Sequence, residues 1–461
     1  MLRRGLLVAF CLLMGCRSEN VAADPAPPTP RPWQLRATPT SALPSIRGLR
    51  PVRGILHSHS PYSHDACDKK GLGADGKPAP ACVADLRRGM CDAAEDFVFL
   101  TDHAAHMAEQ SFDDLFFVQP GDTPVLGTAG TRIANRVDCG DGRRVLVMVG
   151  NENRLMTAGL EKHLPGDATT RLASYDGDDA ATIDAMHAAG ALVFVPHSES
   201  RPDDYLATMP FDGMEIYNIH AAIDPDIRKE FFKLDGFAAA VNVLAYSTDD
   251  TRVPDLALLS FLEDLPVYQA KWDKLLPTRH VTGTVGTDVH ENTFPGAMAD
   301  GERGDSYRRL MRWFSNVLLV SGDLDPGNVK RTLAAGRGYV AVEVLGVPEG
   351  FDFHAESAGS IFEMGADAPA GAKIVARAPV VHDLDPLAQP PVIRMRVLRV
   401  TASGTTVAGE GASIELPNAT PGVYRVEVRM QPNHLKAYLG EVPDKYVRDG
   451  IWVLSNPIYV K

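Results

Sequence analysis

One pattern recurs along this chain and limits the folds open to it: short apolar runs stop abruptly at residues that can bind a metal. Runs of this kind are residues 97–100, 145–149, 192–195 and 281–285. Each is rich in β-branched or aromatic residues and is bounded by turn formers, which is typical of buried parallel strands. Helix-like stretches at 180–189 and 267–276 lie between them. This alternation predicts a parallel α/β fold.

The candidate functional residues follow the predicted strands directly. An apolar run ends at His57-Ser58-His59, and residues i and i+2 of an extended chain point to the same side, so both imidazoles can face one point. Functional groups of parallel α/β barrels lie at the C-terminal ends of the strands. The later strand ends carry Asp102, His103, Glu152, His197, Asp288 and His290.

The order and spacing of these motifs resemble the polymerase and histidinol phosphatase (PHP) family of metallohydrolases. The motifs are His-x-His, Thr-Asp-His, Gly-x-Glu, Pro-His and Gly-Thr-Asp-x-His, and the resemblance covers roughly residues 47–339. It implies an α/β fold, a distorted seven-stranded (β/α) PHP barrel, with two or three divalent metal ions at its mouth.

The resemblance implies a specific set of metal ligands. Glu152 matches the carboxylate that bridges two ions. The family also places an Asp or His ligand seven or eight residues after the first histidine, following a Ser, which leaves His64 and Asp65 open with Asp65 favoured. His163-Leu164 resembles a further ligand motif, although Pro165 precedes its glycine. The implied metal ligands are His57, His59, His64 or Asp65, His103, Glu152, His163, His197, Asp288 and His290.

Imidazoles and carboxylates together suit zinc, manganese or iron. Such ions lower the pKa of water and neutralise substrate oxygens, which favours hydrolysis of phosphate esters. Asp102 is expected to orient a neighbouring imidazole, and Arg154 and Arg201 to clamp an anionic oxygen. If the leaving group needs an acid, His220 or His106 is available. A further predicted strand, Met214 to Tyr217, ends with Glu215, Tyr217 and Asn218. It is left out of the ligand set, since in the family this segment shapes the barrel more than it binds metal.

The N-terminus has the pattern of an export signal. Two arginines precede a short apolar run, and residues 13–16 resemble a bacterial lipobox, which implies cleavage before Cys16 and its acylation. Residues 1–15 are therefore predicted to be a lipoprotein signal peptide and residues 16–46 a disordered, Pro-rich tether. The expected location is the bacterial cell envelope, lipid-anchored and facing the periplasm or the exterior.

Export changes the expected state of the remaining cysteines. Cys67, Cys82, Cys91 and Cys139 match no zinc motif, so two disulfides are expected, with three pairings open. A bridge at Cys67 would restrain a loop beside the first metal motif.

The net charge of −13, without a basic run, excludes nucleic acid as a partner but not a small anionic substrate. No protein partner is inferred.

The sequence pattern changes after Tyr339, where alternating strand-like runs replace the succession of strands and helices. Residues 47–338 are assigned to the barrel, ending in a helix that starts at Asp325-Pro326 and stops at Gly336. Alternating runs at 392–400, 423–428 and 451–454 predict a β-sandwich domain over 339–461. Its ending resembles the carbaryl-hydrolase-like (CehA/McbA-like) branch of the same family.

These features predict an exported metal-dependent hydrolase, with a phosphate mono- or diester as the first choice of substrate. The branch resemblance permits a carboxylic or carbamate ester instead. A metal-loaded binding lipoprotein without turnover is the alternative from a different class.

Overall fold

The computed structural model describes residues 31–441 and 443–461, with the side chain of Ala238 excepted. The predicted signal peptide and Cys16 lie outside the described residues. No helix within them has the length and apolar character needed to cross a bilayer.

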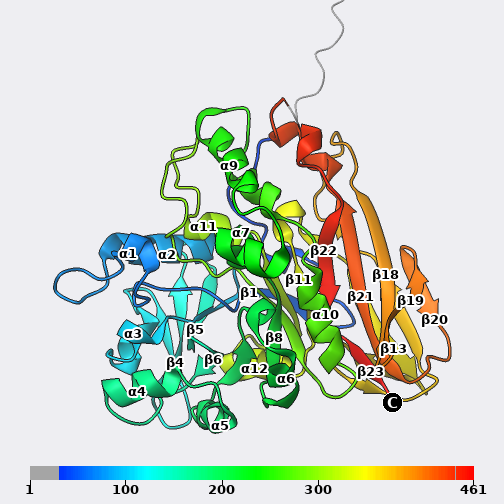
Figure 1. Ribbon diagram of the computed structural model, residues 1–461, viewed down its shortest axis with the longest axis horizontal. Coiled ribbons are helices and arrows are strands. Elements are labelled where there is room, and N and C mark those ends of the chain that lie inside the picture. Colours follow the sequence, from blue (N-terminus) through cyan, green and yellow to red (C-terminus); the bar gives the residue numbers. More distant parts are fainter. Residues whose placement is uncertain (1–30, 442) are drawn as a thin grey trace, which may run out of the picture.

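A large mixed sheet with helices around it forms the first part of the molecule (Figure 1). Its strands are β1 (Arg50–Ile55), β2 (Phe97–Leu100), β3 (Thr123–Leu126), β4 (Arg132–Asp138), β5 (Arg144–Glu152), β6 (Met156–Leu160), β7 (Leu192–Val195), β8 (Gly213–Asn218), β9 (Thr282–Gly286), β10 (Ser315–Val320) and β11 (Gly338–Ala341). Four of the predicted apolar runs coincide with β2, β5, β7 and β9, and their residues are buried because helices cover the sheet.

The helices lie between these strands along the chain. The α-helices are α1 (Ala66–Lys69), α2 (Pro80–Asp92), α3 (Ala104–Met107), α4 (Ala168–Tyr175), α5 (Ala180–Ala188), α6 (Asp203–Thr208), α7 (Ile219–Ile223), α8 (Pro225–Ile227), α9 (Ala238–Thr248), α10 (Pro266–Leu275), α11 (Tyr307–Met311) and α12 (Pro326–Ala334). Shorter 3₁₀ turns are η1 (Thr40–Ala42), η2 (Phe112–Phe116), η3 (Ser198–Ser200), η5 (Pro254–Phe261), η6 (Glu343–Leu345), η7 (Asn433–Tyr438) and η8 (Pro443–Lys445), and η4 (Arg228–Phe232) is a π-helix. The predicted helices at 180–189, 267–276 and 326–335 are confirmed as α5, α10 and α12. The side chain of Asp325 caps α12 by accepting a hydrogen bond from the Asn328 amide at 2.8 Å.

Seven strands follow one another in the order β1-β2-β5-β6-β7-β8-β9. The ladders β1–β2, β2–β5, β7–β8 and β8–β9 are parallel as expected, but β6 is antiparallel to both of its neighbours because it returns from β5 as a hairpin. No ladder joins β9 to β1 in the described chain. A single parallel bridge between Ser58 and Val289 connects their ends, so a closed barrel is not established.

Two buried asparagines satisfy the backbone of β9 on the side away from β8. Asn316, on β10, accepts from the Val285 amide and donates to the Val285 carbonyl, both at 3.0 Å. Asn456 does the same for Gly283, at 2.8 and 3.2 Å. Buried backbone groups need such partners, and here side-chain amides replace a neighbouring strand.

The C-terminal part is rich in β-structure but continuous with the large sheet. Its strands are β12 (Pro348–Glu349), β13 (Asp352–Ser357), β14 (Ser360–Glu363), β15 (Asp367–Ala368), β16 (Lys373–Arg377), β17 (Val380–Val381), β18 (Val392–Thr401), β19 (Gly404–Glu410), β20 (Ser413–Leu416), β21 (Gly422–Gln431), β22 (Gly450–Ser455) and β23 (Ile458–Val460). β11 pairs with β10 on one side and β22 on the other, while β14-β13-β16-β20 form a separate sheet. The β-rich region is thus present, whereas the finer prediction of a separate β-sandwich is not established.

The described end of the expected tether packs on the body of the protein. The Trp33 indole donates to Asp255 Oδ2 at 2.8 Å and meets the Tyr438 ring edge-on at 5.2 Å. Thr40 donates to Asp96 Oδ2 at 2.6 Å. Residues 31–44 therefore differ from the expected disordered tether, because an aromatic contact and hydrogen bonds to residues distant in sequence fix them on the body of the protein.

Asp255 joins this N-terminal segment to the core. Its buried carboxylate accepts from Arg308 and Arg309 and also from Arg312. Burial alone would raise its pKa, but these guanidinium groups outweigh it and lower the pKa to about 2. The group therefore stabilises the folded state fully above its unfolded pKa, and that contribution is lost as the pH falls from about 4 towards 2.

We expect Asp255→Asn to lower the free energy of unfolding by about 3–5 kcal/mol at neutral pH, because it leaves buried guanidinium charge unpaired. Urea unfolding at neutral pH and in acid measures this, and the variant should lose part of the acid dependence of the parent. Asp113→Asn is the control, since that side chain is 66% exposed. Equal stability of Asp255→Asn and the parent would contradict the role assigned to this residue.

Candidate metal centre

The residues that follow the strand ends converge. The chains leaving β1 and β9 run side by side, with the Asp288 amide donating to the His57 carbonyl and the His59 amide to the Val289 carbonyl, both at 3.0 Å. Five overlapping groups result, within each of which the ligand atoms lie within 4.8 Å of one another. The groups are His57–His59–Asp288, His57–Glu152–His197, His59–His103–His290, His64–Asp65–His103 and His220–Asp288–His290.

The Asp288 carboxylate is the centre of this arrangement. Its two oxygens face different sets of imidazoles. Oδ1 lies 3.2 Å from His57 Nε2, 3.1 Å from His59 Nε2 and 3.3 Å from His290 Nδ1, and Oδ2 lies 3.1 Å from His197 Nε2 and 3.2 Å from His220 Nδ1. A carboxylate placed in this way can serve more than one cation.

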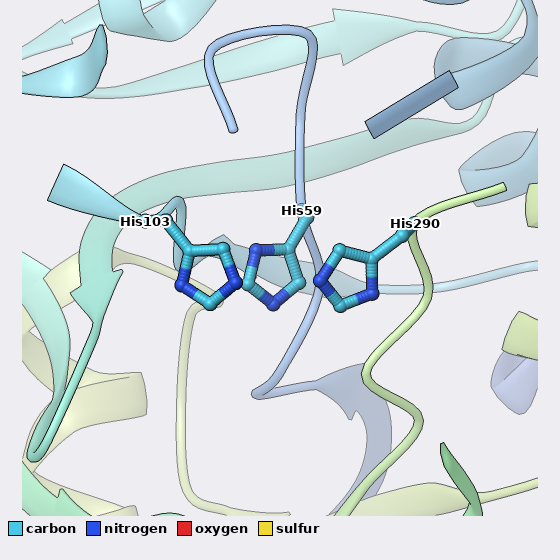
Figure 2. Close-up of side chains that lie close together, drawn as sticks. All are labelled: His59, His103 and His290. Carbon is cyan, nitrogen blue, oxygen red and sulfur yellow. The ribbon is translucent and has the colours of Figure 1, made fainter. Parts of the chain in front are cut away.

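A second set of rings extends from this centre (Figure 2). His59 stacks on His290 with centroids 3.7 Å apart and lies 4.6 Å from His103 on its other side. Asp65 Oδ2 is 3.7 Å from His103 Nε2 and 3.4 Å from His290 Nε2. His64 is exposed and shares a group only with Asp65 and His103. The geometry therefore favours Asp65 over His64, the choice that the sequence left open.

The donor set fits divalent metal ions. Four buried nitrogens in this cluster lie 3.1–3.4 Å from a carboxylate oxygen but make no well-directed hydrogen bond: Nε2 of His57, His59 and His290, and Nδ1 of His220. Buried polar atoms are nearly always satisfied, so nitrogens that converge on shared carboxylates without such bonds fit a cation between them. Imidazole nitrogens and carboxylate oxygens are ligands of zinc, manganese and iron.

The protonation preferences of the cluster conflict without such a partner. Burial opposes protonation of His57, yet the Asp288 and Glu215 carboxylates hold its pKa well above the usual value. Burial lowers the pKa of His59, and the neighbouring His290 lowers it further. Burial also lowers the pKa of His290 to about 4. Metal binding requires neutral imidazoles, a state that the lowered pKa favours for His59 and His290 and that the raised pKa opposes for His57.

Glu215, which the sequence analysis left aside, orients two of the ligands. Its Oε1 lies 2.7 Å from His57 Nδ1, and its Oε2 accepts from the His197 amide at 2.9 Å. Such a carboxylate fixes the tautomer and the direction of a metal-binding imidazole. Glu215 is fully buried in β8, next to β9.

His220 is the other residue missed as a candidate ligand. It was considered only as an acid, but its Nδ1 lies 3.2 Å from Asp288 Oδ2. The signal was present, since His220 lies two residues beyond the end of β8, as His59 and His290 lie beyond their own strands. The strand-end rule points to it, whereas the family resemblance led away from this segment.

Asp102 does not orient an imidazole as expected. Its carboxylate accepts hydrogen bonds from the backbone amide and the hydroxyl of Ser60, both at 2.5 Å. Burial raises its pKa to about 6. Asp102 therefore holds the turn that follows His59 and positions the ligands only through the backbone.

His163 lies apart from the five groups. Its Nδ1 is 3.1 Å from the Tyr175 hydroxyl and its Nε2 is 3.0 Å from the Gln110 carbonyl. Both ring nitrogens are occupied by protein partners, so the structure does not bring His163 to the cluster. Pro165, which departs from the family motif, was the sequence feature that argued against a ligand role for His163.

The two arginines expected to clamp an anion share a carboxylate instead. Arg154 Nη1 and Arg201 Nη1 lie 3.3 and 3.6 Å from Asp178 Oδ2, and Arg201 also donates to the Arg154 carbonyl. The Arg154 side chain is 59% exposed. Their charge is partly neutralised at the surface, which weakens their case as a substrate clamp.

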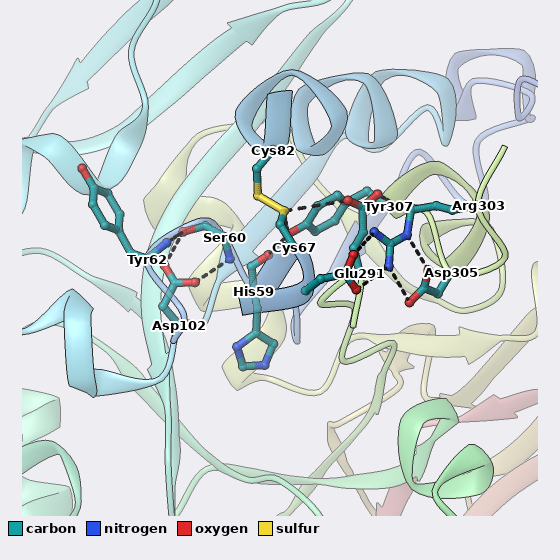
Figure 3. Close-up of a disulfide and its surroundings, with 11 residues drawn as sticks. His59, Ser60, Tyr62, Cys67, Cys82, Asp102, Glu291, Arg303, Asp305 and Tyr307 are labelled. Atoms are coloured by element: carbon teal, nitrogen blue, oxygen red, sulfur yellow. Dashed lines mark hydrogen bonds and ion pairs between the residues drawn. A yellow bond between two sulfur atoms is a disulfide. The ribbon is translucent and has the colours of Figure 1, made fainter. Parts of the chain in front are cut away.

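Disulfides Cys67–Cys82 and Cys91–Cys139 are both formed, as the sequence predicts in number. The first lies beside the cluster (Figure 3). The Cys67 amide donates to the His290 carbonyl at 2.8 Å, and the Tyr307 hydroxyl donates to the His59 carbonyl at 2.8 Å. The bridge therefore ties the loop that carries Asp65, and the backbone of His290, to α2.

Comparison with known proteins leaves the family open. No family model matches the chain, and no curated protein matches it. Among solved structures, PsfC from Pseudomonas syringae PB-5123 is similar with a TM-score of 0.32 at 13% identity, over 62% of this chain and 89% of that one. A likeness at this level carries no functional argument.

Replacing His57 and His59 together by alanine should abolish metal binding, because these residues belong to three of the five groups. The measurement is metal content by mass spectrometry after reconstitution and desalting. Circular dichroism and limited proteolysis should show that the C-terminal β-rich region stays folded. His163→Gln is the matched control and should keep the full metal content; retention of metal by the double variant would refute the site.

The two disulfides allow a paired test of ligand positioning. We expect Cys67→Ser with Cys82→Ser to cost about 3 kcal/mol of stability and to weaken metal binding by at least about tenfold, because Asp65 and His290 lose their support. The bridge Cys91–Cys139 closes a longer loop, so its removal should cost about 4 kcal/mol but leave metal affinity unchanged. Equal metal affinities of the two double variants would rule out a positioning role.

Proposed function

We propose that this protein is an exported, lipid-anchored, metal-dependent hydrolase of phosphate mono- or diesters. One observation carries the proposal: among the described residues, five groups that could hold a metal ion overlap through shared residues. Both oxygens of Asp288 lie next to imidazole nitrogens of these groups. Overlap of this kind favours two or three ions over one. The motif resemblance to the PHP family agrees with it.

Bound ions would lower the pKa of water and neutralise negative charge on the substrate. The ligands named above would hold them: His57, His59, Asp65, His103, Glu152, His197, His220, Asp288 and His290. Phosphate ester hydrolysis is among the slowest uncatalysed reactions and gains most from such charge neutralisation.

The protein's own groups prepare the site. Glu215 holds the Nδ1 side of His57, so that Nε2 faces the cluster. Glu199 Oε1 lies 3.3 Å from His197 Nδ1 and steadies that ring. Burial of His57, His59 and Asp288 excludes bulk water and strengthens the electrostatic interactions there.

A carboxylic or carbamate ester is the second candidate substrate, and two observations favour it. The expected arginine clamp is paired with Asp178. The wall of a small cavity against His220, Asp288 and His290 includes four apolar side chains, Ile219, Ile223, Phe294 and Leu310, among polar ones. These apolar side chains suit contact with the aryl or alkyl group of an ester.

Export is supported by chemistry as well as by the N-terminal sequence. Two disulfides in one chain are typical of an oxidising compartment. The lipobox-like residues before Cys16 favour attachment to a bacterial envelope membrane.

Metal-reconstituted protein should hydrolyse bis-p-nitrophenyl phosphate or p-nitrophenyl phosphate, and Asp288→Asn should reduce the rate by at least about 100-fold, since it removes the shared carboxylate. His187→Gln, an exposed histidine outside the cluster, is the control and should keep full activity. Turnover of naphthyl acetate alone would favour the ester hydrolase. No turnover of any substrate by metal-loaded protein would favour the binding lipoprotein.

A further inference from the structure

Helix α9 has an apolar surface that the rest of the described chain does not cover. Phe237, Val241 and Leu244, at positions i, i+4 and i+7, are 72%, 67% and 68% exposed. This spacing places them on one side of the helix. The other large exposed apolar residues of the described chain come from segments spread along the sequence, such as Leu126, Ile361 and Val407.

The opposite side of α9 is already packed. Ala239, Val243 and Tyr246 are buried, and the Ala239 carbonyl accepts from the Ser260 hydroxyl of η5 at 3.1 Å. A helix that is apolar on both sides is either buried or in contact with an apolar medium. The outward side of α9 therefore calls for an external apolar partner.

The start of the described chain lies at the same end of the molecule as α9. The Arg31 carbonyl accepts from the Tyr438 hydroxyl at 2.7 Å, at the end of η7. The neighbouring η8 reaches α9, where Lys445 Nζ donates to Asn242 Oδ1 at 2.5 Å. α9 and the segment around 433–445 (red) lie at the same end of the molecule in Figure 1.

Chain length limits how far this end can lie from a lipid anchor. Arg31 follows Cys16 by fifteen positions, and even a fully extended chain of that length spans at most about 50 Å. If Cys16 carries lipid, Arg31 stays within that distance of the bilayer. Helix α9 lies at the same end of the molecule (Figure 1).

We propose that α9 rests on the bilayer, with Phe237, Val241 and Leu244 inserted at the boundary between headgroups and acyl chains. This inference rests on the proposed lipid anchor and not on the hydrolase activity. The contact of α9 would add to the attachment that the lipid at Cys16 supplies. Exposed charges of both signs surround the helix, including Lys233, Lys445 and Asp444, so the contact is apolar rather than electrostatic.

Site-specific fluorescence tests the contact. The cysteines of the described residues are all in disulfides, so Val241→Cys can carry an environment-sensitive nitrobenzoxadiazole probe in the full-length acylated protein. Val407→Cys, on β19 and 50% exposed, is the matched control. The vesicles contain phosphatidylethanolamine and phosphatidylglycerol, with a nitroxide-labelled lipid as the quencher.

Emission from the probe at Val241 should fall by at least about twofold when nitroxide lipid is present, while the control probe stays unquenched. Adding Phe237→Ser and Leu244→Ser should remove the quenching without lowering the unfolding midpoint, because both side chains are exposed. Absence of quenching at Val241 in acylated protein overturns the proposal, and so does equal quenching at both positions.

Two further outcomes point elsewhere. A blue shift at Val241 without vesicles, together with sedimentation as a dimer, would assign the face to a second copy of the chain and overturn the membrane contact. An N-terminal peptide without lipid by mass spectrometry would overturn both the anchor and this inference. Activity on a soluble substrate is measured separately, so loss of the membrane contact and loss of the hydrolase are distinguishable.

Discussion

The crowding of imidazoles around the Asp288 carboxylate is the constraint on which the rest of the structure depends. Removing a carboxylate and several histidines from water is unfavourable unless each group finds a partner. The backbone is also held in an uncommon conformation there, since Asp288 and His197 have φ of 51° and 46°. Residues persist in the left-handed region only when their surroundings fix them, and such residues gather at functional sites.

The surroundings of Asp288 provide that support from several directions. Its amide is bonded to the His57 carbonyl, so the first and last motifs are joined directly. Glu215 contacts the His57 ring and the His197 amide, and the Cys67–Cys82 bridge supports Asp65 and His290. Segments more than two hundred residues apart in sequence therefore hold one set of side chains in place.

The sequence predicted the strand ends because buried parallel strands have a local signature. β2 was placed to the residue, and the metal motifs follow the predicted strands. What failed depended on partners distant in sequence. The antiparallel β6 has no local mark that gives its direction, and residues 31–44 look like a linker until Trp33 meets Asp255, which lies more than two hundred residues away. The pairing of Arg154 and Arg201 with Asp178 could not be predicted either, because the spacing of charged residues along the sequence does not tell which of them meet in the folded chain.

The continuity of the sheet gives the C-terminal region a part in the site. β9 ends just before Asp288, yet no strand of the described chain forms a hydrogen-bonded ladder with its side away from β8. Asn316 and Asn456 bond that side, and Asn456 belongs to the C-terminal region, between β22 and β23. Arg425 on β21 also pairs with Asp273 of α10 at 2.8 Å. A strand whose backbone is completed by side chains from another region cannot keep its position independently of that region, so the β-rich part helps to set the position of the metal-binding carboxylate.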